Sequence, residues 1–145
     1  MVAGALALAT PLAGQSTELG IQAVATASDP ALAAAGLYAG VRTSTRTRLS
    51  AWAGAGISSD DMAFRGELLG HFLLSPNQLA GTGFYVGGGV AAVAGAVGRG
   101  YLVLTAGVED RPGAGSGWAA ELGIGGGVRV ALGYRWRRLR GVNVR

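Results

Sequence analysis

The chain contains no cysteine, no lysine and a single histidine in 145 residues. The absence of cysteine excludes a disulfide framework, a thiolate zinc site and a thiol nucleophile, and one histidine excludes a metal site built on two imidazoles. Charged residues make up only 14% of the chain, roughly half the share of ~25% that is usual in globular proteins. All 12 positive charges are arginine. No basic run is interleaved with a recognisable reading element, so nucleic-acid binding is not expected.

Long apolar runs are also missing, because no stretch reaches the ~18 consecutive large apolar residues of a membrane helix. What the sequence has instead is 27 glycines together with a hydrophobic fraction of 50%. That apolar content is too high for a disordered glycine-rich chain. The length fits one domain with at most a short extension.

The first residues are set apart by their composition. They read MVAGALALATPLAGQ, an apolar core followed by small residues, which is typical of a secretory signal and its cleavage region. A basic segment before the apolar core is missing, and an apolar first strand or a short buried helix is the alternative. We interpret residues 1–15 as a signal-peptide remnant, 16–138 as the folded domain and 139–145 as a basic C-terminal tail.

From Thr17 onward, apolar residues alternate with small or polar ones, and this period of two predicts β-strands rather than helices. Turn residues divide the pattern into eight runs. The runs cover residues 17–27, 33–43, 46–57, 62–74, 83–94, 100–109, 117–125 and 128–138. The glycines at 125–127 predict a tight turn between the last two runs.

The alternation gives the predicted sheet two different faces, since residues of one parity share a face. One face carries apolar side chains and no charge, and among its members are Leu19, Leu37, Leu49, Phe64, Leu68, Leu104, Leu122, Val130 and Leu132. The other face is mostly Gly and Ala but carries the charges that lie well inside the runs. Those charges are Glu18, Arg42, Arg48, Arg65, Glu67, Glu121, Arg129 and Arg135.

Alternation alone does not decide which face meets water, because a soluble barrel buries its apolar face and a membrane barrel turns it toward lipid. Two observations favour the membrane barrel. The polar face has few of the charged and hydroxyl side chains that a water-exposed surface carries, which suits a narrow lumen. The number of runs is even, and each is about as long as the ~9–11 tilted residues that cross a bilayer.

Aromatic residues supply a third observation. Five lie on the apolar face near the ends of runs: Phe72, Phe84, Trp118, Tyr134 and Trp136. In an up-and-down arrangement all five fall at one rim, which predicts an aromatic girdle at a membrane interface. Scattered core aromatics of a soluble β-protein are the alternative.

The stretch from about 16 to 138 resembles the small eight-stranded outer-membrane barrels, of the kind of the OmpA transmembrane domain and OmpX. The closing segment GGGVRVALGYRWRR, residues 125–138, is similar to the alternating, aromatic-ended last strand of that family. The chain departs from the family pattern in the nine residues after Trp136 and in its longer connections, 75–82 and 110–116, which fall on the side of the N-terminus. The resemblance implies an all-β fold, an eight-stranded antiparallel up-and-down transmembrane β-barrel.

The interior of an eight-stranded barrel is only wide enough for side chains to fill it. Buried charges without partners are strongly destabilising, so we expect the eight lumen charges to pair and to close the lumen. If the 125–127 turn is centred at Gly126, residue 121 lies opposite 131, and Glu121 lies diagonally next to Arg129. Closure of the barrel is expected to bring Glu18 next to Arg135.

Two motifs are candidates for chemistry. Glu67 and His71 share a face, and with Ser50 they could form a Ser-His-Glu trio of the kind that some outer-membrane lipid deacylases use. That trio would point into the lumen and away from lipid, where a hydrogen-bonded histidine is the expected role. The glycine clusters 83–89 and 123–127 lack the following helix that a phosphate-binding loop needs. We therefore expect no catalytic, cofactor-binding or metal-binding residues.

These observations predict a monomeric, non-enzymatic protein of a bacterial outer membrane, with a closed, salt-bridged lumen and a structural or membrane-organising role. Outer-membrane lipid is the expected partner, and no outer loop is long enough to suggest a large protein partner. Two alternatives stay open. One is a soluble secreted β-barrel that binds a small apolar ligand inside, and the other is an outer-membrane hydrolase that modifies lipid.

Overall fold

The structure is a computed structural model that describes residues 16–27, 31–95 and 98–138. The predicted signal remnant, 1–15, and the predicted tail, 139–145, lie outside the described residues. Within those residues, eight strands form one closed barrel. They are β1 (Thr17–Ala27), β2 (Leu32–Arg42), β3 (Thr47–Ser58), β4 (Asp61–Leu73), β5 (Thr82–Ala94), β6 (Arg99–Asp110), β7 (Ser116–Ile124) and β8 (Val128–Arg138). No helix in the described part of the chain is long and apolar enough to cross a membrane.

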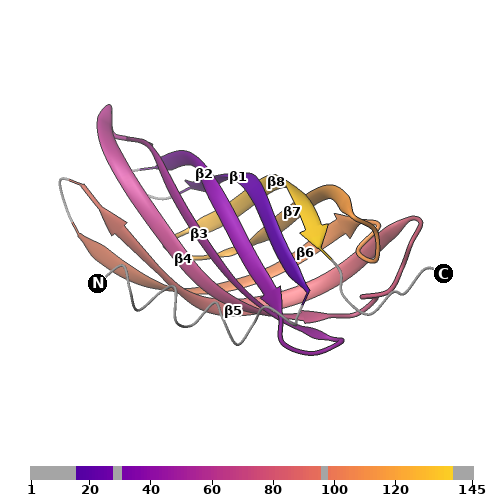
Figure 1. The fold of residues 1–145 in the computed structure, drawn as a ribbon. Coiled ribbons are helices and arrows are strands. Elements are labelled where there is room, and N and C mark those ends of the chain that lie inside the picture. Colours follow the sequence, from indigo (N-terminus) through magenta and orange to yellow (C-terminus); the bar gives the residue numbers. More distant parts are fainter. Residues whose placement is uncertain (1–15, 28–30, 96–97, 139–145) are drawn as a thin grey trace, which may run out of the picture.

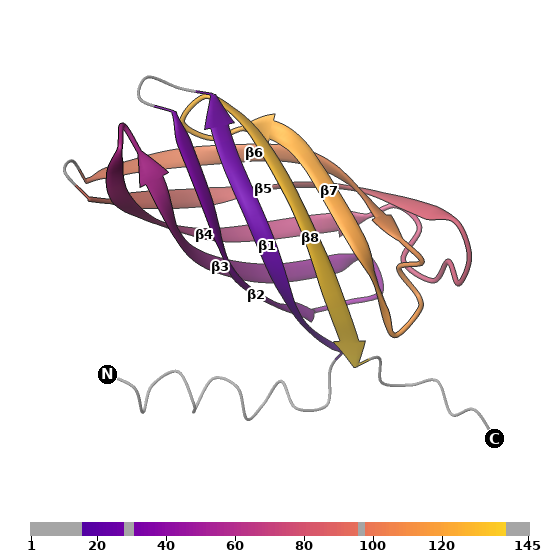
Figure 2. The ribbon, with the colours of Figure 1, turned by 90° about the horizontal axis from the view of Figure 1, so that it is seen from above.

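Each strand pairs antiparallel with its neighbours in the chain, and β1 pairs with β8 to close the barrel. Figure 1 shows the strands wrapped around a common interior, and Figure 2 shows β1 and β8 side by side. The strand bounds differ from the predicted runs by at most one residue at either end. The predicted eight-stranded, up-and-down, antiparallel barrel is confirmed.

The two faces of the barrel wall separate by parity, as the alternation predicts. Outward-facing Leu102 and Leu37 are 80% and 71% exposed, whereas inward-facing Arg129 is fully buried and Glu18 is 1% exposed. A water-soluble protein has the opposite distribution, with apolar side chains inside and charges outside. The wall therefore divides a polar interior from an apolar exterior.

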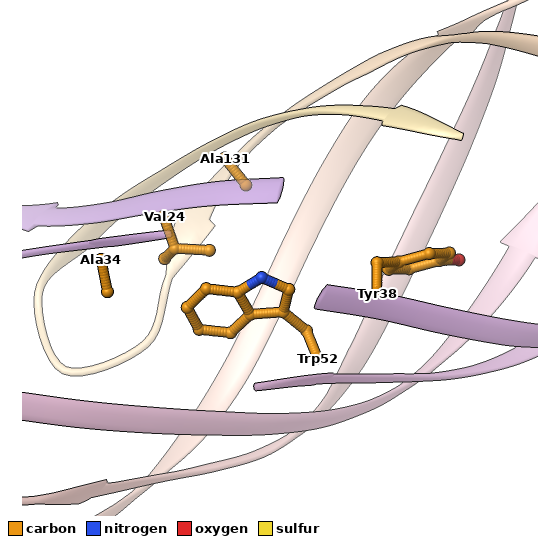
Figure 3. Close-up of a cluster of buried hydrophobic side chains, with 5 residues drawn as sticks. All are labelled: Val24, Ala34, Tyr38, Trp52 and Ala131. Carbon is orange, nitrogen blue, oxygen red and sulfur yellow. The ribbon is translucent and has the colours of Figure 1, made fainter. Parts of the chain in front are cut away.

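A small apolar cluster also lies inside the barrel, made of Val24, Ala34, Tyr38, Trp52 and Ala131. In Figure 3 the Trp52 indole extends toward Val24 and Ala34, while the Tyr38 ring lies on its other side. The indole Nε1 donates a hydrogen bond to the carbonyl oxygen of Gln22 at 3.1 Å. The one polar group of this large side chain is thereby satisfied inside the lumen.

Inward-facing glycines make room for the large side chains of the lumen. A Cβ at Gly54 would overlap the Trp52 indole, and a Cβ at Gly107 would overlap the Tyr85 ring. On the outer face the situation differs, because a Cβ at Gly70 would meet nothing closer than the Gly88 carbonyl oxygen at 3.9 Å. The narrow lumen thus accommodates each of these rings only where the adjacent wall residue is glycine.

This difference predicts the effect of enlarging two glycines. Gly107→Val should lower the free energy of unfolding by ~1–3 kcal/mol, because the added methyl groups force the Tyr85 ring out of its place. The matched control Gly70→Val adds the same atoms on the outer face and should change stability by less than ~0.5 kcal/mol. Denaturant titration of the barrel in lipid vesicles measures both. Equal losses at the two positions would show that Tyr85 is not the reason for glycine at 107.

Candidate functional site: the charged lumen

A network of arginine and glutamate side chains fills the lumen. Its carboxylates are Glu18, Glu67, Glu109 and Glu121, and its cations are Arg42, Arg48, Arg65, Arg129, Arg135 and Arg137. The carboxylates come from β1, β4, β6 and β7, and the arginines from β2, β3, β4 and β8. Several ion pairs therefore join strands on opposite sides of the barrel that no backbone hydrogen bond connects.

The half of the network nearer the chain termini is built on Glu18 and Glu109. The same two arginines contact both of these carboxylates. Arg48 Nη1 lies 3.2 Å from Glu18 Oε2 and 3.0 Å from Glu109 Oε2. Arg137 Nε lies 2.9 Å from Glu18 Oε1, and its Nη2 lies 3.3 Å from Glu109 Oε2. Each of these two guanidinium groups thus bridges two carboxylates.

The other half is built on Glu67 and Glu121, which Arg129 connects. Arg129 donates from Nε and Nη2 to the two oxygens of Glu67, a bidentate pair, and from Nη1 to Glu121 Oε1 at 2.9 Å. Arg65 Nη2 also contacts Glu67 Oε2 at 2.8 Å. Arg135 joins the two halves, because its Nη1 lies 3.1 Å from Glu109 and its Nη2 lies 3.2 Å from Glu121. The ion pairs therefore form one continuous network.

Aromatic rings fill the space between the charges. The Tyr85 hydroxyl donates to Glu121 Oε2 at 2.7 Å, and the Arg48 guanidinium lies over the Tyr85 ring at 4.8 Å from its centroid. The Arg135 guanidinium lies over the Tyr38 ring at 4.2 Å. Stacking of this kind stabilises a cation beyond its ion pairs. The middle of the lumen is therefore packed with side chains.

Among the described residues of the network, six arginines face four glutamates, so positive charge is in excess by two. Arg42 is the arginine farthest from a carboxylate, with Nη2 at 3.8 Å from Glu18 Oε1. It donates instead to the carbonyl oxygens of Pro76 and Pro112. Arg137 likewise donates from Nη1 to the carbonyl oxygens of Asp110, at 3.4 Å, and Arg111, at 3.2 Å. Backbone carbonyl dipoles thus offset part of the excess charge.

Those carbonyls belong to the connections 74–81 and 111–115 and to the end of β6, on the side of the chain termini. Both Pro76 and Pro112 are buried. The two connections are also joined to each other, since Arg111 N–H donates to the Gly81 carbonyl at 2.9 Å and Gly113 N–H donates to the Gln78 carbonyl at 2.8 Å. Together they form a cap over this mouth of the barrel, which Arg42 ties to the lumen.

The five aromatic residues predicted as a girdle all point outward from the wall, and each is at least 38% exposed. They lie near the ends of β4, β5, β7 and β8 that are on the same side as the chain termini. Tyr134 and Trp136 contact each other edge to face, with 5.2 Å between ring centroids. The Tyr134 hydroxyl lies 3.0 Å from Ser116 Oγ. Apolar rings with polar groups at one rim are the arrangement that a membrane interface favours.

No protein-family model matches the chain, and no curated protein matches it. Solved structures, however, match the chain. The N-terminal β-barrel domain of OprF from Pseudomonas aeruginosa superposes with a TM-score of 0.66 at 15% sequence identity, covering 83% of this chain and 97% of that one. Neisserial surface protein A (NspA) superposes with a TM-score of 0.57 at 11% identity, covering 86% of this chain and 96% of that one. Both are outer-membrane β-barrel proteins.

The fold is that of the small outer-membrane β-barrels. The predicted resemblance to the OmpA and OmpX kind of barrel is confirmed at the level of the fold.

The structure places all eight predicted lumen charges inside the barrel wall. Two members of the network, Glu109 and Arg137, lie outside the predicted set. Each lies one residue from the end of its strand, β6 or β8, where the alternation merges into a connection or into a basic run. Both have the inward parity of their strand, so parity applied to the last residues would have identified them.

The predicted register at the 125–127 turn is observed, with Glu121 opposite Ala131 and Gly123 opposite Arg129. Closure of the barrel brings Glu18 and Arg135 to diagonal positions, because Arg135 lies opposite Gly20, two residues along β1 from Glu18. The residue directly opposite Glu18 is Arg137, with which it forms one of its ion pairs, while Arg135 forms ion pairs with Glu109 and Glu121. Arg137 was not predicted as the direct partner of Glu18, because the stagger of the closing strand pair follows from the shear of the whole barrel, which the run lengths do not reveal.

The residues considered for chemistry each have another partner. Ser50 Oγ lies 3.5 Å from the Leu69 carbonyl, His71 Nδ1 accepts from Arg48 Nε at 3.2 Å, and Glu67 binds arginines. No hydrogen bond joins Ser50, Glu67 and His71 in the part of the chain that the structure describes. The described residues also contain no group of three His, Cys, Asp or Glu side chains placed for a metal ion. The two glycine clusters lie in β5 and at the β7–β8 turn.

Proposed function

We propose that the chain is an integral protein of a bacterial outer membrane, with a closed lumen and a structural, membrane-organising role that involves no catalysis. One observation carries this proposal, namely that the barrel wall has charges inside and large apolar side chains outside. Such a wall is stable against lipid. In water it would expose a far larger apolar surface than monomeric soluble proteins tolerate, which counts against a soluble ligand-binding barrel.

Closure of the lumen is supported by how the charges are used. Each of the four lumen glutamates contacts at least two arginines, and tyrosine rings occupy the space between them. The mouth on the side of the termini is covered by the two connections that Arg42 binds. An interior filled in this way is a plug that adds stability and leaves no continuous water path.

The outward aromatic residues support a fixed depth in the membrane. Rings near one rim, with the Tyr134 hydroxyl turned to Ser116, match the preference of tyrosine and tryptophan for the headgroup level. A lipid-modifying hydrolase is the less favoured function, because Ser50, His71 and Glu67 face the lumen rather than the lipid. A monomer surrounded by lipid fits all these features.

Membrane integration has a direct test in a Gram-negative host. The folded protein should sediment with the outer-membrane fraction, resist extraction by carbonate and high salt, and need detergent to dissolve. Its gel mobility should change on heating, because a closed barrel that stays folded in detergent migrates differently from the unfolded chain. A folded monomer that stays in solution without detergent would contradict the proposal.

Closure of the lumen has its own prediction in planar bilayers. The wild-type protein should give no steady ion current, because side chains fill the lumen. Arg42→Ala should produce brief current steps more often, since the cap over the mouth loses its bonds to Pro76 and Pro112. Arg138→Gln is the control, an exposed arginine at the same rim that does not belong to the lumen network. Large, stable steps from the wild type would show an open lumen and leave the membrane assignment intact.

A further inference from the structure

The outer wall contains an apolar groove of about 940 Å³ that crosses from β3 to β7. Its floor lies where Gly70 of β4 and Gly88 of β5 are direct cross-strand partners. The same cross-strand row continues to Leu49 on one side and Leu104 on the other. With neighbouring strands ~4.8 Å apart, four such spacings make the groove ~19 Å long, which is close to the length of an extended fatty-acyl chain.

Of the two floor glycines, Gly70 is not required by the local packing, whereas a side chain at Gly88 would be crowded by a backbone carbonyl. A Cβ at Gly70 would meet nothing closer than 3.9 Å, and a Cβ at Gly88 would lie 3.2 Å from the flexible Leu104 side chain and from the Val103 carbonyl oxygen. Neither glycine has the positive φ that would demand glycine. The next outward pair toward the rim, Phe72 and Val86, is large. The depression is therefore a feature of the outer surface and does not result from crowding inside the lumen.

One end of the groove is polar. It reaches Thr43 and Thr47 at the β2–β3 connection, and Arg46 of the same connection is exposed. Arg46 Nη1 donates to the carbonyl oxygens of Leu73, at 3.5 Å, and Leu74, at 3.2 Å. No carboxylate of the described residues forms an ion pair with it. A positively charged, hydroxyl-bearing end on an apolar channel has the polarity of an anionic headgroup joined to an acyl chain.

We propose that this groove binds one glycerophospholipid of the surrounding membrane, with its phosphate at Arg46 and one acyl chain along the floor formed by Gly70 and Gly88. The inference rests on the proposed function, because the groove faces lipid only if the barrel spans a membrane. A second barrel would present a convex wall that cannot reach the floor, whereas an acyl chain is narrow enough to lie in it.

The physical basis of this binding differs from that of a ligand site in water. An acyl chain gains little by leaving bulk lipid, since lipid tails are as apolar as the groove. Selectivity must then come from close packing of the acyl chain against the two floor glycines and from the charge-assisted bonds between Arg46 and the phosphate. Both contributions can be removed by one substitution each.

Native mass spectrometry of the delipidated barrel in detergent, titrated with dioleoyl phosphatidylglycerol, tests the proposal. The wild type should retain one lipid per chain. Gly70→Leu, which fills the floor, and Arg46→Gln, which removes the charge, should each weaken binding about tenfold, or ~1.4 kcal/mol. Two controls should bind like the wild type. Gly100→Leu lies on the outer face outside the groove, where a Cβ is 3.8 Å from the nearest atom, and Arg138→Gln removes another rim arginine.

Every result of this lipid titration either supports the proposed lipid site or overturns it. Equal lipid retention by the wild type and all four variants would overturn the inference, and so would a wild-type dimer that Gly70→Leu converts to monomer. If Gly70→Leu fails to give a heat-modifiable barrel, Arg46→Gln decides alone, because it leaves the wall unchanged. Failure of the proposed function is separately visible, since the chain would then not need detergent to stay in solution.

Discussion

Arg129→Gln is expected to lower the free energy of unfolding by ~3–5 kcal/mol, the usual effect of removing one partner of a buried ion pair. Arg129 is fully buried and contacts both Glu67 and Glu121. Its loss leaves Glu67 with Arg65 as its one remaining ion-pair partner among the described residues. Urea titration of the barrel folded in lipid vesicles, followed by heat-dependent gel mobility, measures the loss.

A double-mutant cycle shows whether the contact itself is responsible. Glu121→Gln should also destabilise, and the double variant should lose less than the sum of the single losses, with a coupling of ~0.5–3 kcal/mol. The coupling stays partial because Glu121 also binds Arg135 and Tyr85.

The chain offers a matched control in the Arg111–Asp110 pair, whose nitrogen and oxygen lie 3.0 Å apart but whose side chains are 47% and 23% exposed. Arg111→Gln should therefore change stability by less than ~1 kcal/mol. If Arg129→Gln and Glu121→Gln were as mild as this control and showed no coupling, the lumen charges would be hydrated and the closed, ion-paired lumen would be wrong.

The sequence predicts the wall of this barrel well because each strand separates two different environments. A period of two then sorts every strand residue to one side or the other, and it placed Leu104 outside and Arg129 inside without any knowledge of pairing. The short 125–127 turn also fixed the register of the last hairpin. Local pattern was enough for both results.

Features that depend on contacts between distant strands could not be predicted in the same way. The Glu18–Arg137 pair depends on the stagger of the closing strands, and Arg42 reaches carbonyls 34 and 70 residues away. The groove depends on Gly70 meeting Gly88. The connection 74–81 between their strands is too long to impose that register by itself, because only short turns do so.

The environment outside the wall is the point on which the proposed function depends most, and Leu104→Arg tests it. Leu104 lies in the middle of β6 and points outward, with 61% of its surface exposed. An arginine at the midplane of a bilayer destabilises a barrel by ~2–4 kcal/mol, and this penalty falls to ~0–1 kcal/mol near the interface. Val130→Arg, on the outer face of β8 but only two residues from its start, should show a smaller loss.

Leu79→Arg is the matched control, because Leu79 is 71% exposed but lies in the connection after β4, beyond the strands. In a membrane the two leucines differ in their surroundings, so Leu104→Arg should be destabilising and Leu79→Arg close to neutral in vesicle-based unfolding titrations. In a soluble barrel both leucines would face water, and both substitutions would change stability by less than ~0.5 kcal/mol. The difference between positions 104 and 79 therefore reports which solvent surrounds the wall, independently of how the lumen is filled.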